Sequence, residues 1–395
     1  MNQNFSAKEL LRYLRLADLK EHKITKEDLV AKLEIASKAI TEGNFDFSIH
    51  KNGLIFYTGN LVDILILRKL NDNIKRIYKD EQSNRRVIIN QVTTLLPDGC
   101  PFWILRTDIS KFYESVDRDR IYSKLHNDAR LSYFSLWAIK RIFTNSVIAA
   151  YNGLPRGIGI SATLSEIYMR KFDRYIRGCR GVYYYSRFVD DILIFSNSED
   201  SLKEIRDHMD KNLETGLTQN ISKTQIYNGS SITEKNPLEY LGYKFLIQRL
   251  KGDTKSVNIS IAETKVKKIK TRLVLSFVTF LNDSDIAMLE KRLRFLTGNY
   301  SIKSSSESGH DLKAGIYYNY LHINDLSPLK ELNGFYHQLL NSKAGSFGTK
   351  LTAKLPVADK IRLMKYSFKQ GFKQKIYHRF TFADMKKIKE CWKYE

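Results

Sequence analysis

Apolar side chains near the start of the chain recur at three- and four-residue intervals. Leu10 and Leu14 mark one such stripe, and Leu29 and Leu33 mark a second. This spacing places the apolar side chains on one helix face, so it predicts two helices within the first 45 residues. The segment 61–80 repeats the pattern before it becomes basic, which predicts a third helix.

From residue 102 onward, short apolar runs alternate with longer amphipathic stretches. FWILRTD (102–108) is a short apolar run that ends in a carboxylate, the pattern of a buried strand. A helical stretch follows at 118–148, and the Gly/Pro-rich loop GLPRGIG (153–159) opens another helix that runs to Arg177. VYYYSRF and ILIF flank the residues from Val189 to Asp191 and predict a β-hairpin.

The order of these elements predicts an α+β fold. SEDSLKEIRDHMDKNLE (198–214) has the N-cap and acidic first turn of a helix, and ISKTQIYN returns to extended periodicity. The succession strand, helix, hairpin, helix, strand is the split β-α-β motif, which packs an antiparallel sheet on two helices. In this fold Asp108 and the hairpin tip at Asp190 can lie side by side although they are far apart in sequence.

The C-terminal part combines strands with basic helices. EYLGYKF and SVNISI are strand-like, 263–298 is a lysine-rich helical pair, and SSSESG (304–309) is the best linker candidate. Lys and Arg residues alternate with Phe, Tyr and Trp over 351–395. Such a mixture can bind phosphates through its cations and stack nucleobases on its rings. The alternative for this tail is an ordinary helical subdomain with buried rings and solvated lysines.

The charge of the chain favours nucleic acid as a partner. Its formal net charge is +22, and a field of that sign attracts polyanions. The segment from Leu246 to the end contains 28 Lys and Arg residues but only 13 Asp and Glu residues. We therefore expect this C-terminal third to bind the nucleic-acid backbone. A merely basic, well-solvated surface remains the alternative.

Two further features indicate a soluble cytoplasmic protein that does not enter a membrane. No apolar run approaches the roughly 18 residues that a membrane span needs. The three cysteines, Cys100, Cys179 and Cys391, are too few and too scattered for a disulfide framework or a zinc motif.

Three carboxylates carry the candidate chemistry. Asp108 ends a predicted strand, and Asp190 and Asp191 lie between two apolar runs. Carboxylates gathered in a basic protein repel one another unless cations lie between them, and Mg²⁺ prefers carboxylate and phosphate oxygens. Two such ions, with Mn²⁺ as the alternative, can activate a hydroxyl and stabilise a leaving oxygen. A solvated turn is the alternative for an isolated Asp-Asp pair.

At these residues the sequence resembles a known family. RTDISKFYESVD, GLPRGIGISATLSEIYM, YSRFVDDILIF, NISKTQ and LEYLGYKF stand in the order of the palm motifs of reverse transcriptases, over about 100–246. Within that family the chain is most similar to bacterial defence-associated reverse transcriptases of the unknown groups, relatives of retron and group II intron enzymes. The resemblance implies a right-handed polymerase: fingers at 1–100, a ferredoxin-like palm at 101–246 with inserted fingers helices at 118–150, a thumb at 247–303 and a basic aromatic-rich extension at 304–395.

The resemblance also implies roles for single residues. Asp108, Asp190 and Asp191 match the catalytic metal carboxylates, and Ile109, which we place with the metal ligands, matches the position whose backbone helps hold the triphosphate. Tyr113 matches the aromatic gate that excludes a ribose 2′-hydroxyl; its alternative is a ring packed under the sheet.

The loop at 153–159 matches the family's template and nucleotide contacts, with two departures. Gly157 and Gly159 would let the backbone approach the template base and the incoming nucleotide. Arg156, however, stands where Gln is usual, and Ala162 stands where Pro often follows the Ser. These departures put the template and nucleotide contacts in doubt more than the chemistry.

Other matched positions lie outside that loop. Lys223 matches the family's lysine that would protonate the leaving pyrophosphate as a general acid, a role that needs a lowered pKa. Arg85 and Arg86 are candidates for a bidentate grip on the triphosphate. Alternatively, Lys223 and the two arginines are solvated surface cations. Residues Leu241, Gly242 and Tyr243 match the primer-grip turn.

The sequence therefore predicts an RNA-directed DNA polymerase that adds dNTPs to a primer 3′-hydroxyl or a protein hydroxyl. Its partners would be an RNA template, expected to be a dedicated non-coding RNA of antiphage defence, and the DNA product, with a homo-oligomer or a companion defence protein left open. Neither a retron Asn-Ala-x-x-His signature nor an RNase H carboxylate set is found. Two alternatives stay open: an RNA-dependent RNA polymerase, and a catalytically silent RNA-binding subunit.

Overall fold

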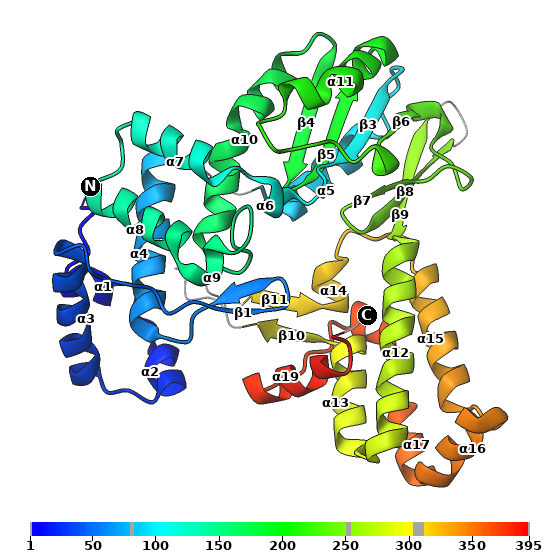
Figure 1. Cartoon of the computed structure of the whole chain (residues 1–395). Helices are drawn as coiled ribbons and strands as arrows, with labels where there is room; N and C mark the ends of the chain where they lie inside the picture. Colours follow the sequence, from blue (N-terminus) through cyan, green and yellow to red (C-terminus); the bar gives the residue numbers. More distant parts are fainter. Residues whose placement is uncertain (1, 80–82, 250–253, 303–311, 394–395) are drawn as a thin grey trace. The chain divides into compact units, whose positions relative to one another are not determined.

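The computed structural model describes residues 2–79, 83–249, 254–302 and 312–393 (Figure 1). Contacts divide the chain into two compact units. The first holds the residues up to Ile88 and Cys100–Gly229, and the second holds Ile89–Gly99 and the residues from Ser230 on. The predicted four-part division into fingers, palm, thumb and extension stays a prediction, and its linker candidate at 304–309 lies outside the described residues.

A four-stranded antiparallel sheet forms the centre of the first unit. Its strands are β3 (Trp103–Asp108), β4 (Val182–Phe188), β5 (Asp191–Ser196) and β6 (Gln225–Asn228), in the order β4-β5-β3-β6. This is the order of a split β-α-β sheet. The helices α10 (Ile160–Gly178) and α11 (Glu199–Asn212) pack against it (Figure 1). Strand β5 consists almost wholly of buried apolar residues, because both of its faces are covered. Ile192 and Ile194 belong to the hydrophobic core, and Phe195 contacts the rings of Phe102 and Tyr184.

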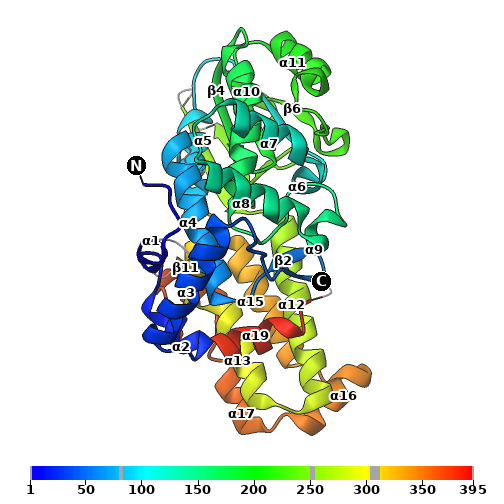
Figure 2. The ribbon, with the colours of Figure 1, turned by 60° about the vertical axis from the view of Figure 1, so that its left-hand side comes forward.

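The remaining elements of the first unit are mostly helices (Figure 2). They are α1 (Ala7–Leu11), α2 (Leu16–His22), α3 (Lys26–Thr41), β1 (His50–Asn52), β2 (Ile55–Tyr57), α4 (Leu61–Tyr78), α6 (Phe112–Ser115), α7 (Arg118–Asn127), α8 (Tyr133–Thr144), α9 (Ser146–Ala149) and η1 (Ile221–Lys223). The helix α5 (Arg85–Leu95) crosses the boundary between the units, and η2 (Gly229–Ser231) begins at the other boundary.

One prediction of helix number was wrong. The first 45 residues form three helices, because the Asp18 carboxylate accepts a hydrogen bond from the Arg15 backbone N–H and starts α2, which Lys23 ends in the left-handed region at φ 50°. The stretch 118–148 is helical as predicted. It is divided into three helices, since Ala129 adopts φ 49° and Asn145 caps α9. Local capping and left-handed residues interrupt a helix without breaking its apolar periodicity.

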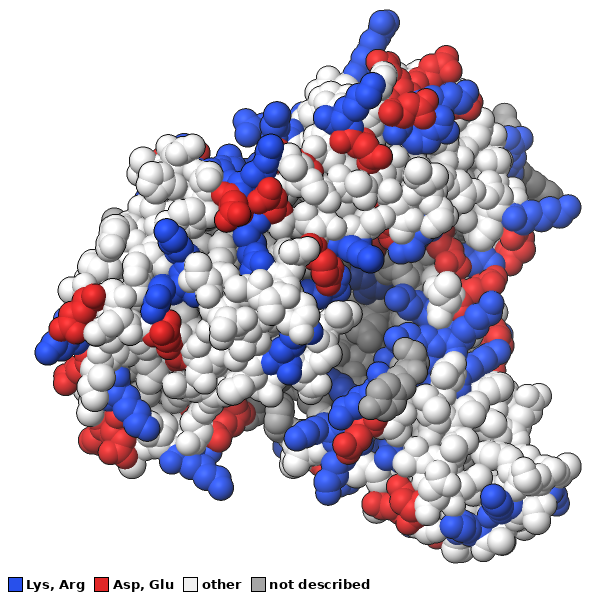
Figure 3. All heavy atoms as spheres, viewed as in Figure 1, with Lys and Arg blue, Asp and Glu red and all other residues white. Residues whose placement is uncertain are grey.

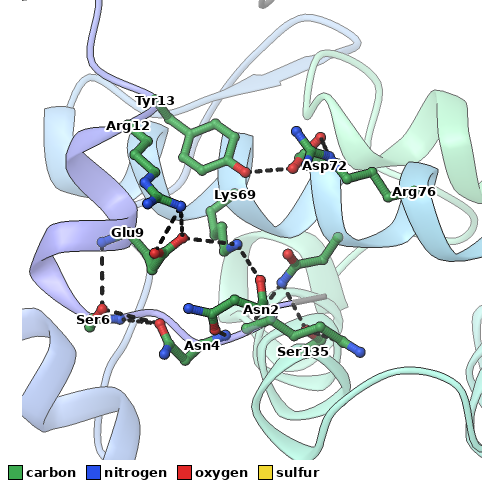
Figure 4. A network of polar contacts seen from close by, with 12 residues as sticks. Asn2, Asn4, Ser6, Glu9, Arg12, Tyr13, Lys69, Asp72, Arg76 and Ser135 are labelled. Carbon is green, nitrogen blue, oxygen red and sulfur yellow. Dashed lines mark hydrogen bonds and ion pairs between the residues drawn. The ribbon is translucent and has the colours of Figure 1, made fainter.

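A polar network fastens the N-terminal segment to α4 (Figure 4). Buried Lys69 donates from Nζ to the Asn2 carbonyl at 2.8 Å and lies 3.9 Å from a Glu9 carboxylate oxygen. Tyr13 donates its hydroxyl to Asp72 at 2.5 Å. Burial lowers the pKa of Lys69, although the nearby Glu9 charge opposes the change. These contacts hold α1 on α4 with directional bonds in addition to apolar packing.

The second unit contains a three-stranded sheet, a β-hairpin and a set of helices. Strands β7 (Leu238–Tyr240), β8 (Tyr243–Arg249) and β9 (Lys255–Ile261) pair antiparallel in that order. Strands β10 (Asn299–Ile302) and β11 (Leu312–Gly315) form the hairpin. The helices are α12 (Glu263–Asp283), α13 (Ile286–Thr297), α14 (Ile316–Asn319), α15 (Ser327–Leu340), α16 (Gly345–Lys354), α17 (Val357–Leu363), α18 (Phe368–Lys373) and α19 (Phe382–Glu390).

Several rings of the C-terminal segment are packed in the core, as the alternative of a helical subdomain expects, whereas Tyr377 is 42% exposed. Contact of this segment with nucleic acid stays a prediction. Phe368, Phe372 and Trp392 are buried, and the Trp392 ring nitrogen donates to the Arg272 carbonyl at 3.1 Å. These rings cannot stack on nucleobases while they stay in the core. Exposed lysines instead follow the first turns of α12, at Lys265, Lys267 and Lys268, and Figure 3 shows basic side chains with acidic ones between them on both units.

Among the described residues, no helix combines the length and the apolar character that a membrane crossing requires.

Candidate active site

The sheet of the first unit brings the three predicted carboxylates together. Asp108 is the last residue of β3 and pairs directly with Asp191, the first residue of β5. Side chains opposite each other on antiparallel strands have Cβ atoms about 4.5–5.5 Å apart. Asp190 precedes Asp191 in the hairpin loop, and its carbonyl accepts a hydrogen bond from the Ile109 N–H at 3.2 Å. The strand end and the hairpin tip therefore form one site.

The hairpin loop that carries Asp190 has a strained backbone. Phe188 and Asp191 close a two-residue loop, and Val189 at its first position has φ 62°. Two-residue hairpin turns of this type favour glycine there, because a positive φ is costly for a β-branched residue. Val189 must therefore be held by its surroundings.

Burial and mutual repulsion disfavour ionisation of the paired aspartates. Burial raises the pKa of Asp191 to about 6, and the Asp190 charge adds to this effect. Burial also raises the pKa of Asp190, with a further contribution from the Asp108 charge. The site thus accumulates negative charge that a cation would stabilise.

Lys223 supplies one such cation. It follows α11 in η1, and its Nζ forms an ion pair and hydrogen bond with Asp108 Oδ2. This hydrogen bond raises the pKa of Lys223, and the Asp108 charge adds to it. The lowered pKa expected of a general acid is therefore not found, because the carboxylate stabilises the charged ammonium.

The carboxylate oxygens of the site are of the type that Mg²⁺ binds. Asp108 Oδ1 is buried and has no hydrogen-bond partner within the described part of the chain, so one carboxylate oxygen is available to a cation. Within the same residues no group of three or more His, Cys, Asp or Glu side chains has a metal-holding arrangement. The other carboxylate oxygen, Asp108 Oδ2, accepts a hydrogen bond from the Lys223 ammonium. The metal set of Asp108, Ile109, Asp190 and Asp191 stays a prediction.

Tyr113 lies in α6 beside an ion pair. The Arg156 guanidinium is centred 5.4 Å from the Tyr113 ring, and Arg156 Nη2 donates to Glu114 at 2.8 Å. Burial raises the pKa of the Tyr113 hydroxyl, although a hydrogen bond with Ser165 opposes the rise. The Leu154 N–H donates to the Tyr113 carbonyl at 2.7 Å, which joins α6 to the glycine-rich loop. Arg156, predicted to bind nucleotide, is thus paired with Glu114 and lies over the ring of Tyr113, the candidate gate.

The glycine-rich loop packs against the β1–β2 hairpin. Gly157 has φ 96°, and a Cβ there would lie 2.4 Å from the Phe56 carbonyl oxygen. The Phe56 N–H donates to the Arg156 carbonyl at 2.7 Å. Gly157 is thus required by a contact within the protein, whereas a Cβ on Gly159 would meet nothing within 4 Å. The predicted nucleotide contact of Gly157 stays a prediction.

The other predicted residues lie at separate positions. Arg85 and Arg86 begin α5, where Arg86 is exposed. In the second unit, Leu241 (φ 47°) and Gly242 (φ 82°) form the β7–β8 turn, and buried Tyr243 donates its hydroxyl to the Asn319 carbonyl at 3.2 Å. Positive φ at both central residues is the requirement of a type I′ hairpin turn. The triphosphate and primer-grip roles stay predictions.

Sequence reasoning missed Arg187 and its partners Glu166 and Asp173. Arg187 is buried two residues before Val189 and forms ion pairs with both carboxylates, at 2.6 and 2.8 Å. A charged residue inside the apolar run VYYYSRF was the available signal, because buried arginine requires paired acids. The partners lie on α10 and carry no signal of their own.

Comparison with known proteins supports this arrangement. Residues 50–245 match the family described as reverse transcriptase (RNA-dependent DNA polymerase), a range that contains the sheet and all three carboxylates. The chain contains a reverse transcriptase domain. No curated protein sequence matches the chain.

Solved telomerase structures resemble this chain at low similarity. Apo telomerase of Candida tropicalis truncated from its C-terminal domain covers 63% of this chain, and Candida albicans telomerase with a fragment of telomeric RNA covers 93%; each has 12% identity and a TM-score of 0.36. Apo telomerase of Candida tropicalis gives the same two values over 95% of the chain. The match spans 51–59% of the length of those proteins.

Proposed function

We propose that this protein copies an RNA template into DNA by two-metal nucleotidyl transfer at Asp108, Asp190 and Asp191. The observation that carries the proposal is the direct pairing of Asp108 with Asp191 next to the Asp190 loop. The three carboxylates come from the end of β3 and from the β4–β5 hairpin, and their burial and repulsion favour a bound cation. In this scheme residues 101–246 are the palm, with the primer grip at Leu241–Tyr243, and residues 247–303 are the thumb.

The residues of the chain would act mainly by positioning and by charge. Bound Mg²⁺ would help to deprotonate the attacking hydroxyl and neutralise the leaving pyrophosphate. Lys223 stays protonated, so it can leave Asp108 and meet the pyrophosphate as a cation. Tyr113, held by the Arg156–Glu114 pair, would exclude a 2′-hydroxyl from the nucleotide site.

The template proposed here is a dedicated non-coding RNA of a bacterial antiphage system, with a primer or protein hydroxyl as the starting point. The likeness of the palm motifs to defence-associated reverse transcriptases supports this finer assignment. The net charge of +22 supports a polyanionic partner.

Primer extension on an RNA template with Mg²⁺ tests the reaction, with dNTPs and NTPs supplied in separate reactions. The proposal expects dNTP incorporation that Asp108→Asn abolishes. Preferred use of NTPs would instead support an RNA polymerase, and no incorporation with either set would support a silent RNA-binding subunit. Sequencing of the RNA and DNA that co-purify with the protein would identify the template.

A further inference from the structure

Arg187 uses its whole guanidinium group in contacts next to the catalytic loop. It lies on β4 with its side chain 3% exposed. Nε and Nη2 donate to Asp173 at 2.9 and 2.8 Å, and Nη2 also donates to Glu166 at 2.6 Å. Nη1 donates to Glu166 at 3.3 Å and to the Val189 carbonyl at 3.0 Å. These five bonds match the five N–H donors of a guanidinium.

The carboxylates hold Arg187 in the charged form. Burial alone would lower the pKa of Arg187, but the hydrogen bonds and charges of Asp173 and Glu166 raise it well above its ordinary value. Tyr185 adds a hydroxyl that donates to Asp173 at 2.6 Å. Buried ion pairs of this kind often contribute little net stability compared with apolar packing. Stability alone therefore does not explain why a guanidinium lies here.

The hydrogen bond from Arg187 to the Val189 carbonyl connects the ion-pair network to the catalytic loop. Val189 has φ 62°, a strained conformation for a β-branched residue that persists only when neighbouring contacts fix it. Its carbonyl is held by Arg187, and the next carbonyl, that of Asp190, is held by the Ile109 N–H. Two hydrogen bonds on successive carbonyls thus fix the loop that presents Asp190 and Asp191.

We propose that Arg187, supported by Glu166 and Asp173, is a positioning residue that holds the Val189–Asp190 loop in its metal-binding conformation. The inference rests on the proposed function of this site. Arg187 touches neither substrate nor metal in this scheme and acts through the backbone of Val189. An apolar side chain would fill the same volume but could not bind the carbonyl, and Lys has a single charge centre that cannot reach all three acceptors.

Kinetics of Arg187→Lys and Arg187→Ala provide the test. We expect kcat to fall about 10–100-fold, the usual effect of losing a group that orients a metal ligand. The Mg²⁺ concentration for half-maximal activity should rise, while the dNTP KM should change much less. Glu166→Gln should shift the Mg²⁺ requirement in the same direction by a smaller factor.

Arg68 offers a matched control. It is an arginine of the same unit that also binds one carboxylate with both Nη atoms, Asp18 at 2.6 and 3.1 Å, and one carbonyl, that of Tyr13 at 2.9 Å. None of these partners belongs to the hairpin. Arg68→Ala should lower thermal stability without changing the Mg²⁺ requirement. Equal Mg²⁺ requirements in Arg187→Lys, Arg68→Ala and the unchanged protein would overturn the inference.

Chemical rescue separates positioning from general damage. Glu166, Asp173 and Arg187 line a cavity of about 560 Å³, through which a small cation can reach the space that Arg187→Ala leaves. Guanidinium chloride, far below denaturing concentrations, should restore part of the kcat of Arg187→Ala, whereas NaCl at equal ionic strength should not. Absence of rescue in a folded variant would contradict the proposal. If Arg187→Ala does not fold, the Mg²⁺ requirement of Arg187→Lys decides; an unchanged protein that incorporates no nucleotide would instead refute the proposed function.

Discussion

Replacing Asp191 with Asn should stabilise the metal-free protein at neutral pH, although it removes a catalytic group. Burial, together with the Asp190 charge, raises the pKa of Asp191 from 3.8 to about 6. A shift of about two pKa units corresponds to about 3 kcal/mol of unfolding free energy at about 1.4 kcal/mol per unit. The folded protein is destabilised by this amount when the Asp191 carboxylate is ionised.

The sign follows from the protonation states. Near pH 3 the carboxyl is largely protonated in both the folded and the unfolded chain, so the group costs nothing. As the pH rises from about 4 to 6, the unfolded chain ionises first, and the folded state loses stability. Above this range the full cost is present. Asp191→Asn should therefore exceed the unchanged protein in stability by up to about 3 kcal/mol at pH 7.5, and the difference should shrink toward pH 4.

Urea unfolding in the presence of a chelator, followed at several pH values, measures this difference. Asp384→Asn is a control of opposite sign, because hydrogen bonds from Lys291 and Thr381 lower the pKa of Asp384 to about 2. That substitution should destabilise the protein at pH 7.5. A pH-independent difference for Asp191→Asn, or a loss of stability at pH 7.5, would refute the electrostatic description of the site.

Three further substitutions test single contacts. Lys223→Ala should strengthen Mg²⁺ binding about fivefold, since it removes a partly exposed ion pair worth about 1 kcal/mol that competes for Asp108; Mg²⁺ should then raise Tm more than in the control Lys203→Ala, and equal shifts would exclude competition. Tyr113→Val should raise ribonucleotide relative to deoxynucleotide incorporation, and an unchanged ratio would return the ring to a packing role. Gly157→Ala should cost about 1–3 kcal/mol of unfolding free energy because its φ is positive and its Cβ would meet the Phe56 carbonyl, whereas Gly59→Ala, where a Cβ meets nothing within 4 Å, should cost much less.

Elements with strong periodicity were predictable from the sequence. The strand ending at Asp108, the hairpin around Asp190 and the long helix after the glycine-rich loop all occur within a few residues of their predicted bounds. Their apolar runs are long enough to determine one element type. Short helices divided by caps, as at Lys23 and Ala129, could not be predicted, because one left-handed residue leaves the apolar spacing intact.

The candidate site was predictable only in part, for a physical reason. The pairing of Asp108 with Asp191 follows from the order of the strands. The ion pair of Arg156 with Glu114 and the network of Arg187 depend on side-chain contacts between elements distant in sequence, which no local pattern encodes. The raised pKa of Lys223 likewise depends on its partner, so the motif alone suggested a shift of opposite direction.

Single-nucleotide incorporation by the double variant Asp190→Asn, Asp191→Asn tests the central claim most directly. The unchanged protein should extend an RNA-templated primer by one deoxynucleotide when Mg²⁺ is present and lose this activity with a chelator. The double variant should show no incorporation but retain nearly the same RNA affinity, because the carboxylates act on the transition state while basic residues bind the strand. Incorporation by the double variant at the rate of the unchanged protein would contradict the account.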